Sequence, residues 1–182
     1  SDTLQVYGNV DEVEVWLNGR VVARRHPDDK PTTEDYVSRP DGGNATNINF
    51  PPFTFFNMKW EQGELKAVGY KDGKAVAECM VRTPGSVEAM DITYFESGVP
   101  ASADDLLIVY VHLKDRQGTD CFGENKREVK LEVLQGGELR GPAEVKAEAG
   151  VASFLVATTD SPVLVMKAVS GNIETKSELK LK

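Results

Sequence analysis

The sequence predicts an all-β protein made of two β-sandwich domains in tandem. Apolar and polar residues alternate with a period of two through most of the 182 residues, as in strands with one buried face. Turn residues interrupt this alternation about every ten residues, a spacing typical of sandwiches. No segment combines a helical period with the ~11 residues of an average helix.

The first domain contains two predicted hairpins. Residues 12–17 alternate between apolar and polar or aromatic side chains and lead through Asn18-Gly19 into the apolar run 21–23. An Asp-Gly dipeptide separates the strand-like runs 65–70 and 75–81 in the same way. Both dipeptides favour the positive φ angles that a two-residue hairpin turn requires, so each marks a tight hairpin.

A long loop and an aromatic strand lie between the two hairpins. Residues 26–47 are rich in prolines, glycines, asparagines and acids, which is typical of a surface loop. Residues 48–60 predict a strand pair or a bent strand. Pro51-Pro52 is expected to open it, because proline cannot occupy the interior of a central strand.

The strand pattern breaks at residues 82–86, where we place the domain boundary. The first domain then covers residues 1–84 and the second covers residues 85–182. The second domain is expected to contain strands near residues 89–95, 106–113, 129–133, 145–149, 151–157, 163–169 and 174–181. We interpret the two runs that flank Gly150 as a hairpin.

Charge and hydropathy exclude several classes of function. The formal net charge is −8 and the isoelectric point is about 4.9, with the acids spread along the chain. A nucleic-acid-binding protein normally carries a basic stripe, and none is visible here. The acidity therefore argues against nucleic acid or an anionic membrane as the partner. No apolar run approaches the ~18 residues of a membrane span.

The two cysteines and the first residues bear on the compartment. Cys79 lies in a strand-like run and Cys121 in a loop of the other half, so we expect two unpaired thiols and no zinc site. The chain opens at Ser1 without the pattern of a signal peptide. We expect that a leader or a larger N-terminal part has been removed.

Several blocks of the first domain resemble one known domain. The run Val6–Arg20, then Pro51–Phe55, Trp60–Tyr70 and Val81–Gly85, resembles in order and spacing a β-sandwich domain of uncharacterised role. That domain follows the catalytic barrel in many bacterial family 2 glycoside hydrolases of the β-galactosidase type. The loop from His26 to Phe50 is longer than the short connection expected in that family.

Residues 86–182 are similar, more weakly, to the immunoglobulin-like domain that usually comes next in those enzymes. The similarity rests on strand spacing and on the run Val109–Asp115 followed by Gly118. The fold that the two resemblances imply is therefore all-β, with two tandem immunoglobulin-like β-sandwich domains.

The chain offers no set of catalytic residues. A retaining glycosidase needs two carboxylates about 5 Å apart, and the related enzymes carry theirs in a (β/α)₈ barrel of about 250 residues. The sequence is too short for that barrel and lacks its alternation of helices and strands. His26 and His112 are expected to be ordinary surface or edge residues, so no catalytic residue and no cofactor is predicted.

Acidic residues crowd the long loop. Calcium binds such oxygens, but the Asp-x-Asp-x-Asp-Gly spacing of a calcium loop is absent. A solvated acidic loop is the favoured interpretation and no metal is predicted, although calcium or sugar binding by the loop stays open. The acids are Asp28, Asp29, Glu34, Asp35 and Asp41.

Four aromatic residues are candidates for binding carbohydrate or a partner. Sugar-binding sandwiches stack sugar rings on exposed aromatic faces. Trp16 shares the parity of Glu14 and is expected to face outward, and Tyr36 lies in the long loop. Phe56, Met58 and Trp60 are expected on one strand face. Phe53 and Phe55 are expected on the other, so both faces of that strand are apolar. The favoured interpretation is that the rings fill a core or an interface, with sugar binding as the alternative.

The resemblance implies a non-catalytic accessory or structural region of a family 2 glycoside hydrolase. Such a region braces the catalytic part or mediates domain and subunit contacts, so its partner is the catalytic domain of the parent enzyme or another subunit. The alternatives are a carbohydrate-binding module, with an oligosaccharide as ligand, and a stand-alone adhesin-like surface protein. In each case we expect a bacterial protein that is periplasmic, secreted or held at the cell surface.

Overall fold

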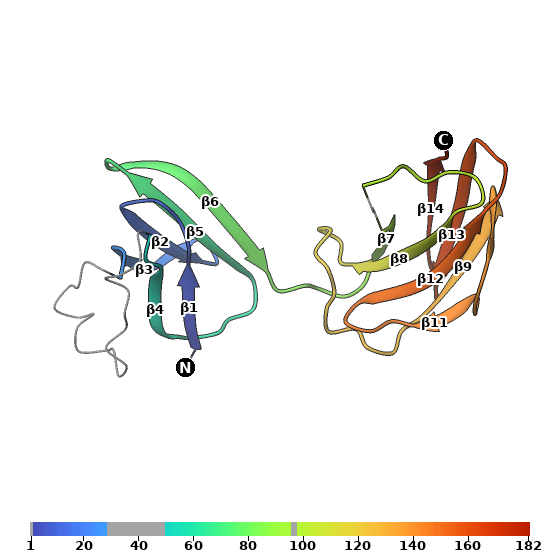
Figure 1. Ribbon diagram of the computed structural model, residues 1–182. Coiled ribbons are helices and arrows are strands. Elements are labelled where there is room, and N and C mark those ends of the chain that lie inside the picture. Colours follow the sequence, from blue (N-terminus) through green and yellow to red (C-terminus); the bar gives the residue numbers. More distant parts are fainter. Residues whose placement is uncertain (1, 29–49, 96–97) are drawn as a thin grey trace. The chain divides into compact units, whose positions relative to one another are not determined.

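A computed structural model describes residues 2–28, 50–95 and 98–182. The described part of the chain is all-β, which confirms the predicted fold class (Figure 1). It contains no helix that is long and apolar enough to cross a membrane. The chain separates into two compact units, residues 1–83 (unit 1) and 84–182 (unit 2), each of which is described by itself below.

The described part of unit 1 contains six strands in two antiparallel sheets. A four-stranded sheet has the order β3-β2-β5-β6, and a two-stranded sheet pairs β1 with β4. The strands are β1 (Asp2–Val6), β2 (Glu12–Leu17), β3 (Arg20–Arg25), β4 (Phe53–Met58), β5 (Glu64–Lys71) and β6 (Lys74–Arg82).

Both predicted hairpins of unit 1 are present. Asn18 and Gly19 have φ angles of 50° and 80° and connect β2 to β3. Asp72 and Gly73, at 50° and 73°, connect β5 to β6. Two successive positive φ angles match the right-handed twist of the flanking strands, which is why these dipeptides specify the turns.

The core of unit 1 is small. Its buried cluster consists of Val13 and Val15 from β2 and Phe53 and Phe55 from β4. The sequence analysis places Met58 on the opposite face from these phenylalanines, and this is wrong, because Met58 packs against the buried cluster. Asn57 has a φ of 57° and the β1–β4 register shifts beside it, so one extra residue turns Met58 back toward the core.

Unit 2 is a sandwich of two four-stranded antiparallel sheets. One sheet has the order β10-β12-β8-β7 and the other the order β11-β9-β13-β14. The strands are β7 (Ala89–Tyr94), β8 (Leu106–Lys114), β9 (Glu128–Gln135), β10 (Gly137–Leu139), β11 (Glu144–Lys146), β12 (Val151–Thr158), β13 (Val163–Ser170) and β14 (Ile173–Lys180).

The core of unit 2 takes buried side chains from the inner faces of both sheets. Val109 and Val111 of β8 and Leu131 of β9 are fully buried there, as are Leu164 and Met166 of β13. This packing of two sheets confirms a β-sandwich. The immunoglobulin-like description of the two domains stays a prediction.

The predicted hairpin around Gly150 is confirmed at its turn but is wrong along its strands. Ala149 and Gly150 form the turn, with φ angles of 49° and 78°, and Glu148 and Val151 on either side exchange two backbone hydrogen bonds. However, β11 before the turn pairs with β9 in one sheet, whereas β12 after it pairs with β8 in the other. Backbone hydrogen bonds on both sides of β11, from Leu131 to Ala143 and from Ala147 to Arg127, hold the segment to β9. The chain therefore changes sheets at this turn.

Candidate interaction surfaces

A buried carboxylate organises the outer face of the four-stranded sheet in unit 1. Glu14 lies in the middle of β2 and points away from the core, yet it is only 4% exposed. The hydroxyl of Tyr70 donates a hydrogen bond to Glu14 at 2.7 Å, and the indole N–H of Trp16 donates to the same oxygen at 3.2 Å. The guanidinium of Arg24 donates to the other oxygen. One carboxylate thus links β2, β3 and β5.

These donors hold Glu14 in its charged form. The Tyr70 hydroxyl, followed by the Arg24 guanidinium, lowers the pKa of the Glu14 carboxyl below its ordinary value. By donating to this carboxylate, Tyr70 has its own pKa raised. Hydrogen bonds to an ionised carboxylate are stronger than those between neutral groups. Three such bonds to Glu14 therefore fix the positions of the side chains around it.

Trp16 belongs to this network. Its ring is half-buried on the outer face, as its parity predicts, and the ammonium of Lys66 lies 5.2 Å from the ring centroid. Because Glu14 uses the indole N–H and Lys66 lies over the ring, a sugar would have to share or displace these contacts to stack on Trp16.

The other predicted aromatic residues come from separate elements. Phe56 lies in β4, in the smaller sheet, where the guanidinium of Arg25 is 5.8 Å from its ring centroid. Trp60 follows the end of β4 and is 70% exposed. Tyr36 lies outside the described residues, as does most of the predicted acidic loop. The binding role of all four residues stays a prediction.

An apolar groove lies beside β1 in unit 1. Its volume is about 370 Å³, and it opens between β1 and the inner face of β5 and β6. Figure 1 shows β5 and β6 passing on one side of β1 and β4 on the other. The lining residues are Leu4, Gln5, Val6, Tyr7, Val15, Leu65, Lys66, Ala67, Cys79 and Val81.

The strand β6 is exposed along its whole length. All nine of its residues are exposed, on both faces of the sheet. Val81 is 59% exposed on the groove side and Met80 is 44% exposed on the opposite side. β6 is also an edge strand that pairs only with β5 in the described part of the chain. A long apolar edge strand of this kind is a ready surface for pairing with another segment.

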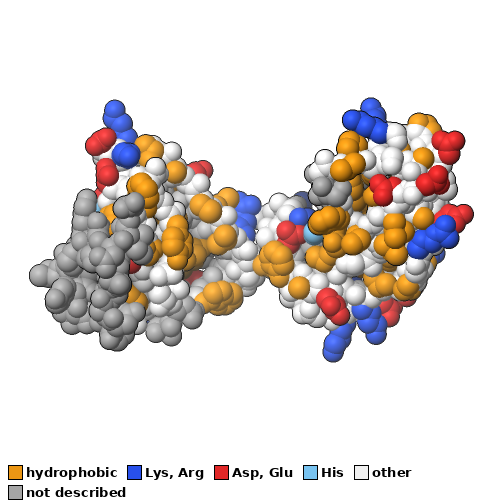
Figure 2. Space-filling view, in the orientation of Figure 1, with side chains coloured by type: hydrophobic (Ala, Val, Ile, Leu, Met, Phe, Trp, Pro, Cys, Tyr) orange, Lys and Arg blue, Asp and Glu red, His pale blue; other side chains and the backbone are white. Residues whose placement is uncertain are grey.

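Unit 2 has an apolar patch on the outer face of one sheet. Leu106 and Ile108 of β8 are 56% and 43% exposed and alternate with buried core residues. Phe95 is 58% exposed and lies beside Ile108, to which its backbone N–H donates. Leu155 of β12 is the partner of Ile108 on the other side. On the visible side of each unit, hydrophobic side chains interrupt the charged surface (Figure 2).

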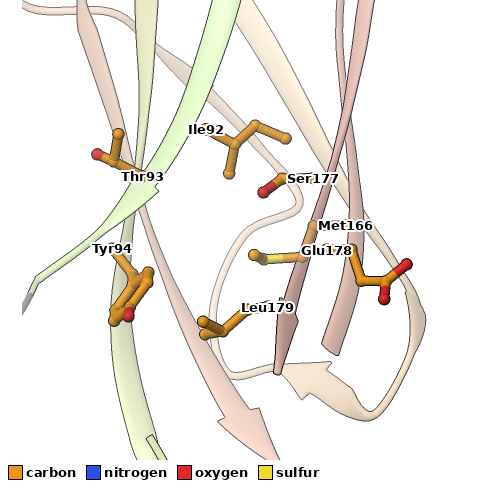
Figure 3. A pocket seen from close by; sticks show the side chains of 7 residues that line it. All are labelled: Ile92, Thr93, Tyr94, Met166, Ser177, Glu178 and Leu179. Atoms are coloured by element: carbon orange, nitrogen blue, oxygen red, sulfur yellow. The ribbon is translucent and has the colours of Figure 1, made fainter. Parts of the chain in front are cut away.

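A small cavity lies at the open edge of unit 2, between the edge strands β7 and β14. Its volume is about 180 Å³. Figure 3 shows apolar side chains facing it from both sheets, whereas the Glu178 carboxylate points away from them. Such a lining offers no acid and base held together over a reacting bond. The lining residues are Ile92, Thr93, Tyr94, Met166, Ser177, Glu178 and Leu179.

Asp115 joins the start of unit 2 to the loop after β8. Its carboxylate accepts backbone N–H bonds from Gly85, Gln117 and Thr119, each at 2.9 Å. These backbone donors, Gly85 first, lower the pKa of the Asp115 carboxyl. Asp115 therefore fixes the point at which the chain enters unit 2.

His112 has a hydroxyl and a carboxylate as neighbours, as catalytic histidines often do, but the geometry does not form a triad. The hydroxyl of Thr93 lies 3.0 Å from its Nε2 atom, whereas Asp120 lies 3.8 Å from its Nδ1 atom. The carboxylate of Asp120 instead lies 2.6 Å from the ammonium of Lys114. A separation of 3.8 Å is too long for the hydrogen bond that orients a catalytic histidine.

Neither metal binding nor disulfide bonding is seen in the described residues. Within residues 2–28, 50–95 and 98–182, no three His, Cys, Asp or Glu side chains are grouped as metal ligands are. Asp28 of the predicted acidic loop accepts hydrogen bonds from the backbone and hydroxyl of Thr54 at 3.1 and 2.6 Å. Cys79 and Cys121 are both free thiols, the first exposed and the second buried.

A comparison with protein families identifies the first unit. Residues 2–77 match the family described as "Domain of unknown function (DUF4982)". Unit 1 is a DUF4982 domain. The match ends within β6, so the family covers nearly all of the described strands of this unit.

Two curated relatives are β-galactosidases. The chain is 25% identical, over all of its 182 residues, to a β-galactosidase of Thermoanaerobacter pseudethanolicus, of which it covers 24%. It is 28% identical over 115 residues to β-galactosidase BoGH2A of Bacteroides ovatus, covering 63% of this chain and 11% of that protein. The chain therefore spans a quarter or less of the curated relatives that it matches.

Solved structures share the fold of the whole chain. A glycosyl hydrolase family 2 member from Bacteroides cellulosilyticus superposes with a TM-score of 0.69 at 18% identity, covering 99% of this chain and 23% of that one. A β-glycosidase from Bacteroides vulgatus gives a TM-score of 0.68 at 14% identity, with coverages of 99% and 22%. The fold of this chain thus occurs within larger proteins, of which it covers less than a quarter.

The sequence analysis missed two features of the DUF4982 domain. Glu14 reads as an outward polar residue, and its burial arises from Tyr70 and Arg24, which lie opposite it only once the strand register is known. The alternation in residues 75–81 reads as a half-buried strand, whereas β6 is exposed on both faces. A cross-strand pairing of the two hairpins could have located the first feature, but no signal in the sequence marks the second.

Proposed function

We propose that this chain is the non-catalytic accessory region of a larger family 2 glycoside hydrolase of the β-galactosidase type. Its two sandwiches brace the catalytic part of the same polypeptide through apolar surfaces. The observation that carries the proposal is the extent of the match, which includes the whole of this chain but only 24% of a β-galactosidase. The larger remainder of such an enzyme has the length that a catalytic barrel needs.

The exposed surfaces of the two units support a role in contact. The apolar groove, the exposed strand β6 and the outer patch of unit 2 offer apolar area that a partner can cover. Apolar area removed from water contributes about 25 cal/mol per Å², so covering these surfaces would stabilise an assembly. The ionised Glu14 network adds a rigid outer face on the DUF4982 domain.

Hydrolysis of a nitrophenyl β-galactoside tests the proposal. The full polypeptide that carries this chain is expected to release nitrophenol, whereas the isolated 182-residue chain is expected to release none above the rate of buffer. The full polypeptide without these residues is expected to keep its catalytic groups but to lose thermal stability. Hydrolysis by the isolated chain would refute a non-catalytic role.

Oligosaccharide binding is a second candidate, favoured by the exposure of Trp60. An exposed indole offers a flat apolar face to a sugar ring. Titration of the isolated chain with galactose-containing oligosaccharides, followed by tryptophan fluorescence, checks this candidate. Wild-type binding that persists in Trp60→Ala removes Trp60 from the site, and an absence of binding removes the candidate itself.

We also propose a periplasmic, secreted or cell-surface location in a bacterium, and an immunoglobulin-like fold for both domains. The bacterial source of the relatives supports a bacterial origin. Fractionation of cells that express the natural gene, followed by detection of the protein in each fraction, checks the location.

A further inference from the structure

We propose that the groove beside β1 binds an extended strand contributed by the catalytic part of the same polypeptide, an inference that rests on the proposed function. The incoming strand adds to the free edge of β1 and covers the inner face of β5 and β6. This mode of recognition, β-strand addition, combines backbone hydrogen bonds with pockets for alternate side chains.

The groove is bordered by a strand edge and not by a strand face. Leu4, Gln5, Val6 and Tyr7 are consecutive residues, and all four line the groove. Successive side chains of a strand point to opposite faces, so a surface that touches four in a row lies along the edge of the strand. In the described part of the chain, β1 pairs with β4 alone, which leaves the backbone groups on the groove side for a further strand.

The two sheets of unit 1 are of unequal width. Two strands face a sheet of four, and the buried core lies where β1 and β4 cover β2. A strand added to β1 would lie about 4.8 Å further on, over the inner face of β5 and β6. Among the residues that the structure describes, none covers the part of the larger sheet that lines the groove.

The floor of the groove defines the chemistry of the incoming strand. Val15, Leu65 and Ala67 line its inner end, and Cys79 and Val81 line its outer end. Every one of these side chains is apolar or a thiol. A volume of about 370 Å³ equals that of about a dozen waters at ~30 Å³ each, which is room for a few aliphatic side chains. The incoming strand therefore carries aliphatic residues at alternate positions.

The length of the relatives favours an occupant from the same polypeptide over a second copy. This chain corresponds to 24% of one β-galactosidase, so the rest of such a polypeptide has about three times its length available to supply a strand. A strand on the same chain also has a high effective concentration, which makes strand addition effective without strong intrinsic affinity.

Cys79 is a native probe for this contact. It lines the groove and is exposed, whereas the other thiol, Cys121, is 3% exposed in the core of unit 2. The measurement is the rate at which a maleimide labels Cys79 in the isolated chain and in the full polypeptide, with the labelled site read by peptide mass spectrometry. We expect rapid labelling in the isolated chain and labelling at least about tenfold slower in the full polypeptide.

A probe on the opposite face of β6 is the matched control. Met80 is adjacent to Cys79, faces away from the groove and is exposed. In a Cys79→Ser, Met80→Cys variant, the new thiol should be labelled at similar rates in both forms. Equal labelling of Cys79 in the two forms overturns the proposal, as does equal protection of both faces. Labelling of Cys79 that is already slow in the isolated chain would also overturn the proposal, and a dilution series would then test a second copy as the occupant.

The outcomes for the groove and for the proposed function are separable. If the full polypeptide hydrolyses the galactoside and Cys79 is labelled as fast as in the isolated chain, the proposed function stands and strand binding in the groove is refuted. A full polypeptide that protects Cys79 but hydrolyses no glycoside keeps a strand in the groove and refutes the proposed function.

Discussion

Truncating Phe55 to alanine should destabilise unit 1 without affecting unit 2. Phe55 is 1% exposed and is one of four residues in the buried cluster of its unit. Replacing a buried phenylalanine by alanine costs about 3–5 kcal/mol, through lost burial and the cavity left behind. A domain of this size is stable by about 4–12 kcal/mol, so the variant loses a quarter or more of its stability. For such a domain 1 kcal/mol corresponds to about 4–8 °C, so the melting temperature of unit 1 should fall by at least about 12 °C.

Tryptophan fluorescence isolates this effect, because both tryptophans of the chain, Trp16 and Trp60, lie in unit 1. Circular dichroism follows both units, so Phe55→Ala should move the fluorescence transition and only the matching part of the dichroism signal. The control is Leu131→Ala, which truncates a fully buried residue of unit 2 at a cost of about 2–5 kcal/mol. If Leu131→Ala shifts the fluorescence transition as well, the two units unfold together and the reasoning fails.

Three further predictions concern single residues. Glu14→Gln should destabilise unit 1 by about 1–3 kcal/mol, because the amide N–H₂ of glutamine replaces a carboxylate oxygen that accepts a hydrogen bond from Tyr70 or Arg24. The folded state lowers the pKa of Glu14, so ionised Glu14 stabilises unit 1 fully above its unfolded pKa near 4.5. This stabilisation is lost as the pH falls through the folded pKa. The free energy of unfolding, measured with urea between pH 3 and 7, should therefore fall less at acidic pH in Glu14→Gln than in wild type. Asp115→Asn should lower the melting temperature of unit 2 in dichroism and leave tryptophan fluorescence unchanged, because it weakens three backbone contacts. Gly136→Ala should destabilise unit 2 far more than Gly118→Ala: both positions have positive φ, costing about 1–2 kcal/mol, but only at Gly136 would the new Cβ lie 1.9 Å from a backbone oxygen.

Strand positions and hairpin turns could be predicted because both follow from local rules. The pleat imposes a period of two, and the Asn18-Gly19 turn needs two residues that tolerate positive φ. The sequence predictions failed where a single residue or turn changed which face of a strand is buried or which strand pairs with it. Asn57 bulges and reverses the parity of Met58, and the turn at Gly150 connects two sheets although the same dihedral angles would serve a hairpin.

The candidate surfaces were harder to predict than the fold. Parity places Trp16 on the outer face, but its contact with Lys66 depends on the register of β2 against β5. The buried state of Glu14 depends on the same register and on Arg24 across the hairpin. Alternation measures which residues share a face, and it does not measure whether anything covers that face. This is why β6 looks half-buried in the sequence and is exposed in the structure.

The contrast between the two units connects stability to function. Unit 2 has two four-stranded sheets around one large core, whereas the described part of unit 1 has a buried cluster of four side chains and an exposed strand of nine residues. An apolar strand left in water contributes little to the stability of its own unit, and it lowers solubility by offering a free edge. Both costs disappear when a partner covers the strand, and the free energy of that contact then adds to the stability of the unit that carries it. Under the proposed function, the catalytic part that covers the inner face of β6 would therefore also stabilise unit 1.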